Sequence, residues 1–238
     1  MTAAAVRIDN LRFRWRADGD DVLDIPELAA SRGEHLFVEG PSGCGKSTLL
    51  ALVGGVALPD HGDVEILGQS LGKLGVRGRD RLRANHVGFV FQLFNLVPYL
   101  STLNNVTLPC RFSKLRQQRA RDADGREQAQ AERLLASLDL PLASVRDRPV
   151  TELSIGQQQR VAAARALMGS PEIIIADEPT SALDEGTRER FLELLMQECR
   201  RAQTTLILVS HDPRLASQFD RRIALASLNR ATAMERNP

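Results

Sequence analysis

The sequence predicts an α/β fold in which a helical subdomain is inserted into a core of strands and helices. Short apolar runs, typical of buried strands, occur before residue 93 and again after residue 168. The middle third is rich in Arg, Gln, Ala and Asp, and four of its apolar residues recur at helical spacing: Ala131, Leu134, Leu135 and Leu138. We therefore expect one domain over residues 1–238, with the core in 1–92 and 169–230 and the helical subdomain in 93–168.

The first strands of the core show a half-buried pattern. From Leu11 to Arg16, apolar and basic residues alternate strictly, so one face of the expected strand is apolar. An acidic turn at 18–21 precedes a second strand, expected at 22–25. Near the other end of the chain we expect an edge strand at 223–225 and then a frayed polar tail.

A phosphate-binding loop is predicted between a strand at 34–38 and a helix at 48–53. The loop fits G-x-x-x-x-G-K-[ST] and comprises Gly40, Pro41, Ser42, Gly43, Cys44, Gly45, Lys46, Ser47 and Thr48. Glycines let backbone N–H groups face a phosphate, and the helix N-terminus adds partial positive charge. Lys46 would reach the β- and γ-phosphates of a nucleotide, and Ser47 would bind Mg²⁺. The alternative is an ordinary glycine-rich turn.

Overall composition limits the classes of function. The chain has 31 basic and 30 acidic residues and a net charge of +1, which gives no support to nucleic-acid binding. Its three cysteines, Cys44, Cys110 and Cys199, lie far apart, which favours reduced cytosolic thiols over a zinc site. No run is long and apolar enough to span a membrane and no signal segment is evident, so we expect a membrane role only through a partner.

Polar residues follow three of the expected core strands. Gln92 ends the strand at 87–91, Asp177 and Glu178 end the strand at 173–176, and His211 follows the strand at 205–210. Side chains at the carboxyl ends of such strands often face a ligand. Asp177 could orient the shell of a Mg²⁺ ion, and Glu178 could polarise an attacking water. For His211 the alternative is an ordinary surface residue.

Three further features leave two interpretations each. Ser154 is a good N-cap, so the helix after it is either an ordinary amphipathic helix or a second anion site that includes Gly156. The apolar segment 93–100 is either core or a docking surface. The alternating arginines of 77–83 are either a solvated surface or a contact with a membrane or an acidic partner.

Taken together, these motifs resemble those of ATP-binding-cassette (ABC) ATPases, in the family's order and over nearly the whole chain. The matching segments are Gly40–Thr48 (Walker A), Gln92 (Q-loop), Leu153–Gln157 (signature), Ile173–Glu178 (Walker B), Ser181–Asp184 (D-loop) and His211 (switch histidine). Trp15 stands where the family has its adenine-stacking aromatic, although it could also simply pack on its strand. Ile155 departs from the commonest signature, which has glycine, and so reduces backbone freedom there. Segments 91–98 and 103–109 are similar to the ATPases of lipoprotein-releasing and macrolide-exporter systems.

The resemblance implies a P-loop NTPase core with a mixed sheet and an N-terminal antiparallel β subdomain. It also implies an ATPase that works as a dimer with ATP and Mg²⁺. Each ATP would lie between the P-loop of one subunit and the signature of the other, represented here by Ser154, Gly156 and Gln157. Ser47 and Gln92 would bind Mg²⁺ directly, and Asp177 would orient the ligands around the ion. Lys46, Glu178 and His211 would be the catalytic residues. Ser181 and Asp184 would lie at the dimer interface.

The resemblance also implies a partner and a place in the cell. The dimer would drive a separate permease from the cytoplasmic face of the plasma (inner) membrane, through the apolar segment after Gln92. One alternative is a soluble ABC ATPase of DNA repair or translation. The spacing from Gln92 to Ser154 is too short for a long coiled coil, and only one cassette is present. A non-ABC P-loop kinase would leave the signature and His211 unexplained.

Overall fold

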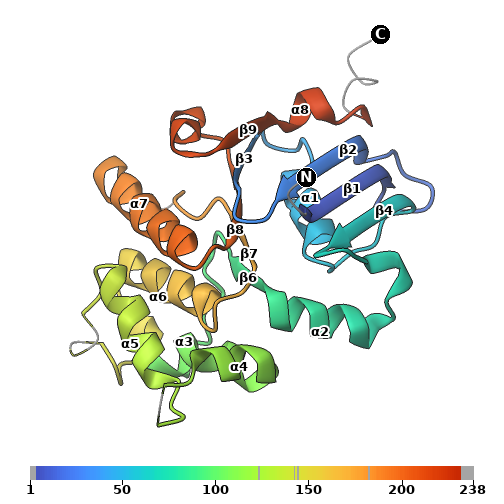
Figure 1. Ribbon diagram of the computed structural model, residues 1–238. Coiled ribbons are helices and arrows are strands. Elements are labelled where there is room, and N and C mark those ends of the chain that lie inside the picture. Colours follow the sequence, from blue (N-terminus) through green and yellow to red (C-terminus); the bar gives the residue numbers. More distant parts are fainter. Residues whose placement is uncertain (1–3, 123, 142, 144, 182, 232–238) are drawn as a thin grey trace. The chain divides into compact units, whose positions relative to one another are not determined.

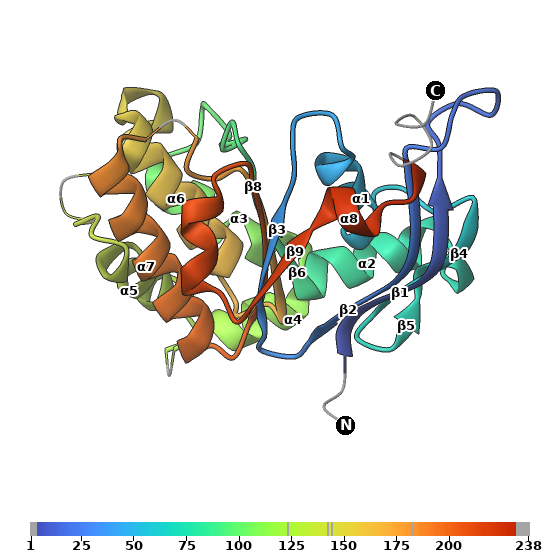
Figure 2. The ribbon, with the colours of Figure 1, turned by 90° about the horizontal axis from the view of Figure 1, so that it is seen from above.

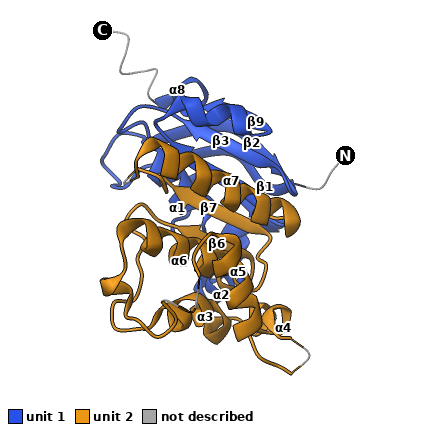
Figure 3. Cartoon of the chain, turned by 90° about the vertical axis from the view of Figure 1, so that its left-hand side faces the viewer, with its two compact units in different colours: residues 1–83, 205–238 blue, residues 84–204 orange. Residues whose placement is uncertain are grey.

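The computed structural model describes residues 4–122, 124–141, 143, 145–181 and 183–231. These residues fall into two compact units, Met1–Arg83 with Thr205–Pro238, and Ala84–Thr204 (Figure 3). Each unit is a part of the chain whose residues contact mainly one another, with boundaries at Arg83 and Thr204. The predicted boundaries at 92 and 168 instead rest on the positions of sequence motifs. The predicted division therefore stays a prediction.

An antiparallel sheet forms one half of the first unit (Figure 1). It contains β1 (Ala4–Phe13), β2 (Leu23–Ser31), β4 (His61–Ile66) and β5 (Gln69–Ser70), in the order β2-β1-β4-β5. The apolar residues of β1 are buried, and Ile8 is paired with Leu28 on one side and Val64 on the other. The N-terminal antiparallel β subdomain is thus confirmed. β2 is longer than predicted because it continues through Pro26, which an edge strand tolerates.

Parallel strands form the other half of the first unit. β3 (His35–Glu39) lies between β8 (Thr205–Ser210) and β9 (Arg221–Ala224), as Figure 2 shows. The chain leaves β3 through the predicted phosphate loop and enters α1 (Lys46–Val53). Two 3₁₀ helices, η1 (Leu71–Lys73) and η4 (Pro213–Gln218), complete the unit together with α8 (Leu225–Leu228). The helix α2 (Val76–His86) carries the alternating arginines.

The tail of the first unit does not fray where it was predicted to. Asn229 is buried after α8, and its side chain accepts a hydrogen bond from the Asp24 N–H at 2.8 Å. The same side chain donates to the Val22 carbonyl at 2.9 Å. The prediction is therefore wrong for residues 226–231, because a single asparagine joins this segment to the start of β2.

The second unit contains two parallel strands and most of the helices. β6 (Val87–Val90) pairs with β7 (Ile173–Asp177), with Val87 opposite Ile173 and Val90 opposite Ala176. Its helices are α3 (Thr102–Phe112), α4 (Lys114–Ala120), α5 (Gln128–Ser137), α6 (Ile155–Leu167) and α7 (Glu185–Arg201), with the 3₁₀ helix η3 (Val150–Glu152). α6 contacts α3, α5 and α7. The predicted helical character of the middle third is confirmed, as is the α/β fold with antiparallel and parallel strands.

A buried arginine joins three elements of the second unit. Arg116 on α4 is 3% exposed, and its guanidinium donates to the carbonyls of Met168 at 2.7 Å and Ala166 at 2.6 Å. These carbonyls end α6, where a positive charge complements the helix dipole. A third contact reaches the Val87 carbonyl of β6 at 3.4 Å. Burial lowers the pKa of Arg116 to about 10, which still leaves it protonated at neutral pH.

Candidate nucleotide-binding site

The loop between β3 and α1 has the backbone geometry that its glycines predicted. Gly43 and Gly45 have φ angles of 82° and 97°, in the left-handed region. At Gly45 a Cβ atom would also lie 2.7 Å from Leu23 Cδ2, so neither the conformation nor the space admits a side chain. Gly45 is the N-cap of α1, and its carbonyl accepts the first hydrogen bond of the helix, from the Leu49 N–H. The loop therefore ends at the N-terminus of α1, which is the end of a helix that favours anions.

Lys46 is held over this loop. Its side chain is 7% exposed, and Nζ donates to the carbonyls of Gly40 at 2.8 Å and Pro41 at 2.9 Å. The exposed residues of the loop are Pro41, Ser42, Gly43 and Ser47. The ammonium group is thus already fixed by the loop that would surround a phosphate.

Trp15 lies beside the last residue of the loop. Its indole Nε1 donates to Thr48 Oγ1 at 3.3 Å, and its ring meets Phe13 edge-on, with ring centroids 4.9 Å apart. Trp15 nevertheless stays 62% exposed. Packing on the strand, one of its two interpretations, explains the contacts at the edge of the ring. The rest of the ring is exposed, so an aromatic face is accessible to a nucleotide base.

His211 and the phosphate loop leave the same edge of the first unit's parallel strands. Glu39 of β3 is paired with Ser210 of β8, and the next residues in the chain are Gly40 and His211. Because the strands are parallel, their carboxyl ends meet at one edge. The two motifs that the sequence placed at strand ends therefore leave neighbouring strands at equivalent positions.

Gln92 and Glu178 show the same relationship in the second unit. Each lies two residues beyond a paired position, since Val90 of β6 is opposite Ala176 of β7. Gln92 is exposed, whereas Asp177 and Glu178 are half-buried. Glu178 has a φ angle of 43°, which is uncommon for a residue other than glycine and is typical of functional sites. The strand predicted at 87–91 is shorter than expected, since β6 ends at Val90.

The signature segment begins α6 with a capping box. Ser154 Oγ accepts from the Gln157 N–H at 3.3 Å, and Gln157 Oε1 accepts from the Ser154 N–H at 3.0 Å. The N-cap prediction is confirmed, and Gln157 has a local structural role that the sequence analysis did not assign. Ile155 is exposed and points its apolar side chain away from the core.

The apolar segment after Gln92 divides into two kinds of residue. Leu93 and Tyr99 are 82% and 83% exposed, whereas Phe94 is buried. Phe94 and Asn95 have φ angles of 60° and 47°, and Arg165 on α6 donates to both of their carbonyls at 2.7 Å. The core interpretation thus holds for Phe94, whereas docking through the exposed side chains stays a prediction.

The predicted D-loop precedes α7. Asp184 is the N-cap of α7, and its Oδ1 accepts from the Thr187 N–H at 3.0 Å. The backbone hydrogen bond from Thr187 lowers the pKa of Asp184. The exposed Ser181 donates its N–H to the Glu178 carbonyl at 3.2 Å. Residue 182 lies outside the described residues.

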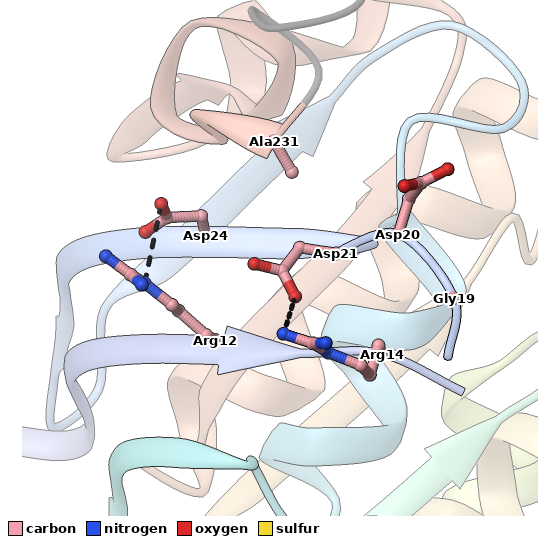
Figure 4. A pocket seen from close by; sticks show the side chains of 7 residues that line it. All are labelled: Arg12, Arg14, Gly19, Asp20, Asp21, Asp24 and Ala231. Atoms are coloured by element: carbon pink, nitrogen blue, oxygen red, sulfur yellow. Dashed lines mark ion pairs between the residues drawn. The ribbon is translucent and has the colours of Figure 1, made fainter. Parts of the chain in front are cut away.

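A charged pocket of about 530 Å³ lies elsewhere in the first unit (Figure 4). It is lined by Arg12, Arg14, Gly19, Asp20, Asp21, Asp24 and Ala231. Its guanidinium groups are paired with carboxylates, Arg14 with Asp21 at 2.8 Å and Arg12 with Asp24 at 3.7 Å. None of the motif residues lines this pocket, so it is separate from the predicted site.

The described residues contain no cluster of three or more His, Cys, Asp or Glu side chains that could hold a metal. The hydroxyl and amide oxygens of Ser47 and Gln92 are donors of the kind that Mg²⁺ accepts when phosphates and water supply the other ligands. Cys44, Cys110 and Cys199 are all buried and free of disulfides. Among the described helices none is long and apolar enough to cross a membrane.

Residues 23–181 match the sequence profile of a family described as ABC transporter. The chain is 43% identical over 206 residues to the "Uncharacterized ABC transporter ATP-binding protein YbbA" of Escherichia coli (strain K12), covering 87% of this chain and 86% of that one. It is 35% identical over 228 residues to the "Lipoprotein-releasing system ATP-binding protein LolD" of Paramagnetospirillum magneticum, covering 95% and 97%.

A solved structure agrees over nearly the full length. It is the "Dimeric structure of a post-hydrolysis state of the ATP-binding cassette MJ0796 bound to ADP and Pi", with a TM-score of 0.81, 34% identity and coverage of 95% of each chain. The resemblance to ABC ATPases, and to their lipoprotein-releasing and macrolide-exporter group, is confirmed. The chain therefore belongs to the ABC transporter family.

Proposed function

We propose that this chain is the ATP-binding and ATP-hydrolysing subunit of an ABC transporter, that it dimerises on ATP, and that it drives a separate membrane permease. The observation that carries the proposal is the loop before α1, where left-handed glycines and a buried Lys46 form a phosphate cradle at a helix N-terminus. Family membership adds that a cassette similar to this chain has been solved as a dimer with ADP and Pi.

The residues of the first unit would bind the nucleotide. The backbone N–H groups of 40–48 would surround the phosphates, and Lys46 would exchange its two carbonyl contacts for β- and γ-phosphate oxygens. Trp15 would stack its exposed face on the adenine. His211, which leaves β8 at the same edge as the loop leaves β3, would hold the γ-phosphate.

Other residues would hold Mg²⁺ and carry out the chemistry. Ser47 from the loop and Gln92 would hold Mg²⁺, with Asp177 orienting its shell, and a bound Mg²⁺ would neutralise charge that develops on the phosphates. Glu178 would accept a proton from the attacking water. Ser154, Gly156 and Gln157 would complete the site of a second copy of the chain, and Ser181 and Asp184 would lie at that dimer interface.

The exposed side chains after Gln92 would contact the permease. Leu93 and Tyr99 are large, apolar and mostly exposed, which is typical of a protein-binding surface. The permease would place this chain at the cytoplasmic face of the plasma (inner) membrane. A role in DNA repair or translation is not favoured, since the chain aligns with 97% of a lipoprotein-releasing ATPase and has no room for a long insertion.

Titration of Mg²⁺ and ATP into the purified protein tests the nucleotide site. Lys46→Ala should abolish tight MgATP binding and phosphate release, because it removes the charge that the loop holds in place. The matched control is Lys73→Ala, which removes an exposed lysine of η1 and should leave both measurements unchanged. Equal affinity for MgATP in folded Lys46→Ala and wild-type protein would contradict the proposed site.

A further inference from the structure

The signature helix is attached to the turn that follows Glu178. Gln159 lies on α6 and is completely buried. Its Nε2 donates a hydrogen bond to the carbonyl oxygen of Pro179, the residue after Glu178. Gln159 belongs to none of the roles proposed above.

The turn that Gln159 contacts has an unfavourable backbone conformation. A non-glycine residue with the φ angle of Glu178, 43°, stays there only when its surroundings fix it. The ring of Pro179 fixes its φ angle. The direction of its carbonyl, and of the peptide bond that follows, therefore depends on its ψ angle alone. A second hydrogen bond, from the Ser181 N–H to the Glu178 carbonyl at 3.2 Å, closes the turn on its exposed side. Gln159 supplies the contact on the buried side.

The second polar atom of Gln159, Oε1, indicates that burying this side chain costs free energy. Among the described residues, no hydrogen-bond donor reaches the buried Oε1. Burying an amide oxygen without a donor is unfavourable, and Leu or Met at this position would avoid that cost. A glutamine is therefore a poor choice for packing alone, and the hydrogen bond to Pro179 is the feature that distinguishes it.

The helix α6 also approaches the segment after Glu178 at a second position, and its other end contacts the segment after Gln92. A methyl group at Gly156 would lie 3.9 Å from Leu183 Cδ2, so the first turn of α6 faces the residues just before α7. Near the other end of α6, Arg165 holds the carbonyls of Phe94 and Asn95. One rigid helix thus contacts the segments that follow Glu178 and Gln92, while Ser154 begins it.

We propose that Gln159 is a positioning residue, which fixes the Glu178–Pro179 turn to α6 and so aims the Glu178 carboxylate. This inference rests on the proposed function, because it assumes that Glu178 acts in hydrolysis. It adds a consequence. A shift of α6 caused by a nucleotide at Ser154 in the partner's site reaches Glu178 in the chain's own site through a single side chain.

Gln159→Met tests the proposal, because Met has a similar length and lacks the amide. The kcat for ATP hydrolysis should fall by about 10- to 100-fold, the size expected for a misplaced catalytic group, while the KM for ATP stays unchanged. The matched control is Gln197→Met, which changes an exposed glutamine of α7 whose side-chain amide donates to Glu193, and it should keep wild-type kcat. Unchanged kcat in Gln159→Met would overturn the proposal.

Two readouts separate positioning from a general structural effect. In a Glu178→Gln background, Gln159→Met should cause no further loss of rate, because the group that it aims is already gone. The ATP-dependent dimer, measured by analytical ultracentrifugation, should persist in Gln159→Met because Ser154 is intact. Additive loss of rate, or loss of the dimer, would show that Gln159 acts elsewhere and would overturn the proposal.

A structural measurement keeps the test independent of activity. A crystal structure of Gln159→Met, or of Gln159→Leu if the first variant does not fold, should show Glu178 outside the left-handed region. A Glu178 φ near 43° in that variant would overturn the proposal. Absence of ATPase activity in the wild-type protein would contradict the proposed function instead, and the backbone of Glu178 would still decide the role of Gln159.

Discussion

The indole nitrogen of Trp15 donates a hydrogen bond to the hydroxyl of Thr48, 3.3 Å away and 33 residues later in the chain. This contact fixes one edge of the ring to the end of the phosphate loop. The ring is therefore oriented before any nucleotide binds, and its exposed face lies next to the place where the phosphates would be held.

Removing this ring should weaken nucleotide binding. Base stacking on an aromatic side chain contributes about 1–3 kcal/mol, so Trp15→Ala should raise the Kd for ATP by about 5- to 150-fold. Trp15→Phe should lose less, because it keeps an aromatic face without the hydrogen bond to Thr48. Isothermal titration measures both. Phe112→Ala, which removes an exposed aromatic side chain of α3, is the control, and equal Kd values in the alanine variants would contradict the role of Trp15.

Replacing the proposed base should separate binding from hydrolysis. Glu178→Gln keeps the shape of the side chain but removes its proton acceptor, so kcat should fall by about 10²–10⁴. ATP should still bind, and an ATP-trapped dimer should accumulate in size-exclusion chromatography. Glu189→Gln changes an exposed carboxylate on α7 and should hydrolyse ATP at the wild-type rate. Near-normal turnover by Glu178→Gln would remove Glu178 from this role.

A site shared between two chains predicts complementation. Lys46→Ala and Ser154→Arg chains should each be inactive alone, because each spoils both sites of its own homodimer. In a mixed dimer, one interface site carries both defects and the other carries neither. Phosphate release should therefore rise with mixing and peak near equal amounts. No activity at any ratio, despite proven mixed dimers, would mean that one chain completes its own site or that both sites must act together.

The segment after Gln92 should respond differently at two adjacent positions. Leu93→Asp puts a charge on an exposed side chain and should abolish co-purification of the permease from native membranes while the thermal unfolding midpoint stays near wild type. Phe94→Asp buries that charge and should lower the unfolding midpoint instead. Val76→Asp, on an exposed apolar residue of α2, is the control for added charge. Retention of the permease by folded Leu93→Asp would argue against docking there.

Glu172 should make stability depend on acid pH. Burial alone would raise the pKa of Glu172, but hydrogen bonds from His86 at 2.9 Å and Arg119 at 2.7 Å outweigh it and lower the pKa to about 2. Because the folded pKa lies below the unfolded one, the stabilisation is complete above about pH 4.5 and is lost as the pH falls toward 2. Urea unfolding of wild type and Glu172→Gln should converge over this range, and a constant difference between them would contradict the assignment.

Several features of the protein follow from interactions between near neighbours in the sequence. The phosphate loop, the Ser154–Gln157 capping box, the Asp184 N-cap and the alternation in β1 each depend on residues within a few positions of one another. A linear pattern therefore contains all the information that these features need. The same holds for the ends of two core strands, where an apolar run stops at Ala176 and at Val209, close to Asp177 and His211.

The tertiary structure decided the rest. Nothing local distinguishes Leu93 from Phe94, and only packing in the second unit exposes one and buries the other. The hydrogen bonds from Arg116 to Ala166, from Gln159 to Pro179 and from Trp15 to Thr48 join residues that are remote in sequence. Burial and partner choice for these side chains depend on which elements meet, and a chain acquires those contacts only when its core is assembled.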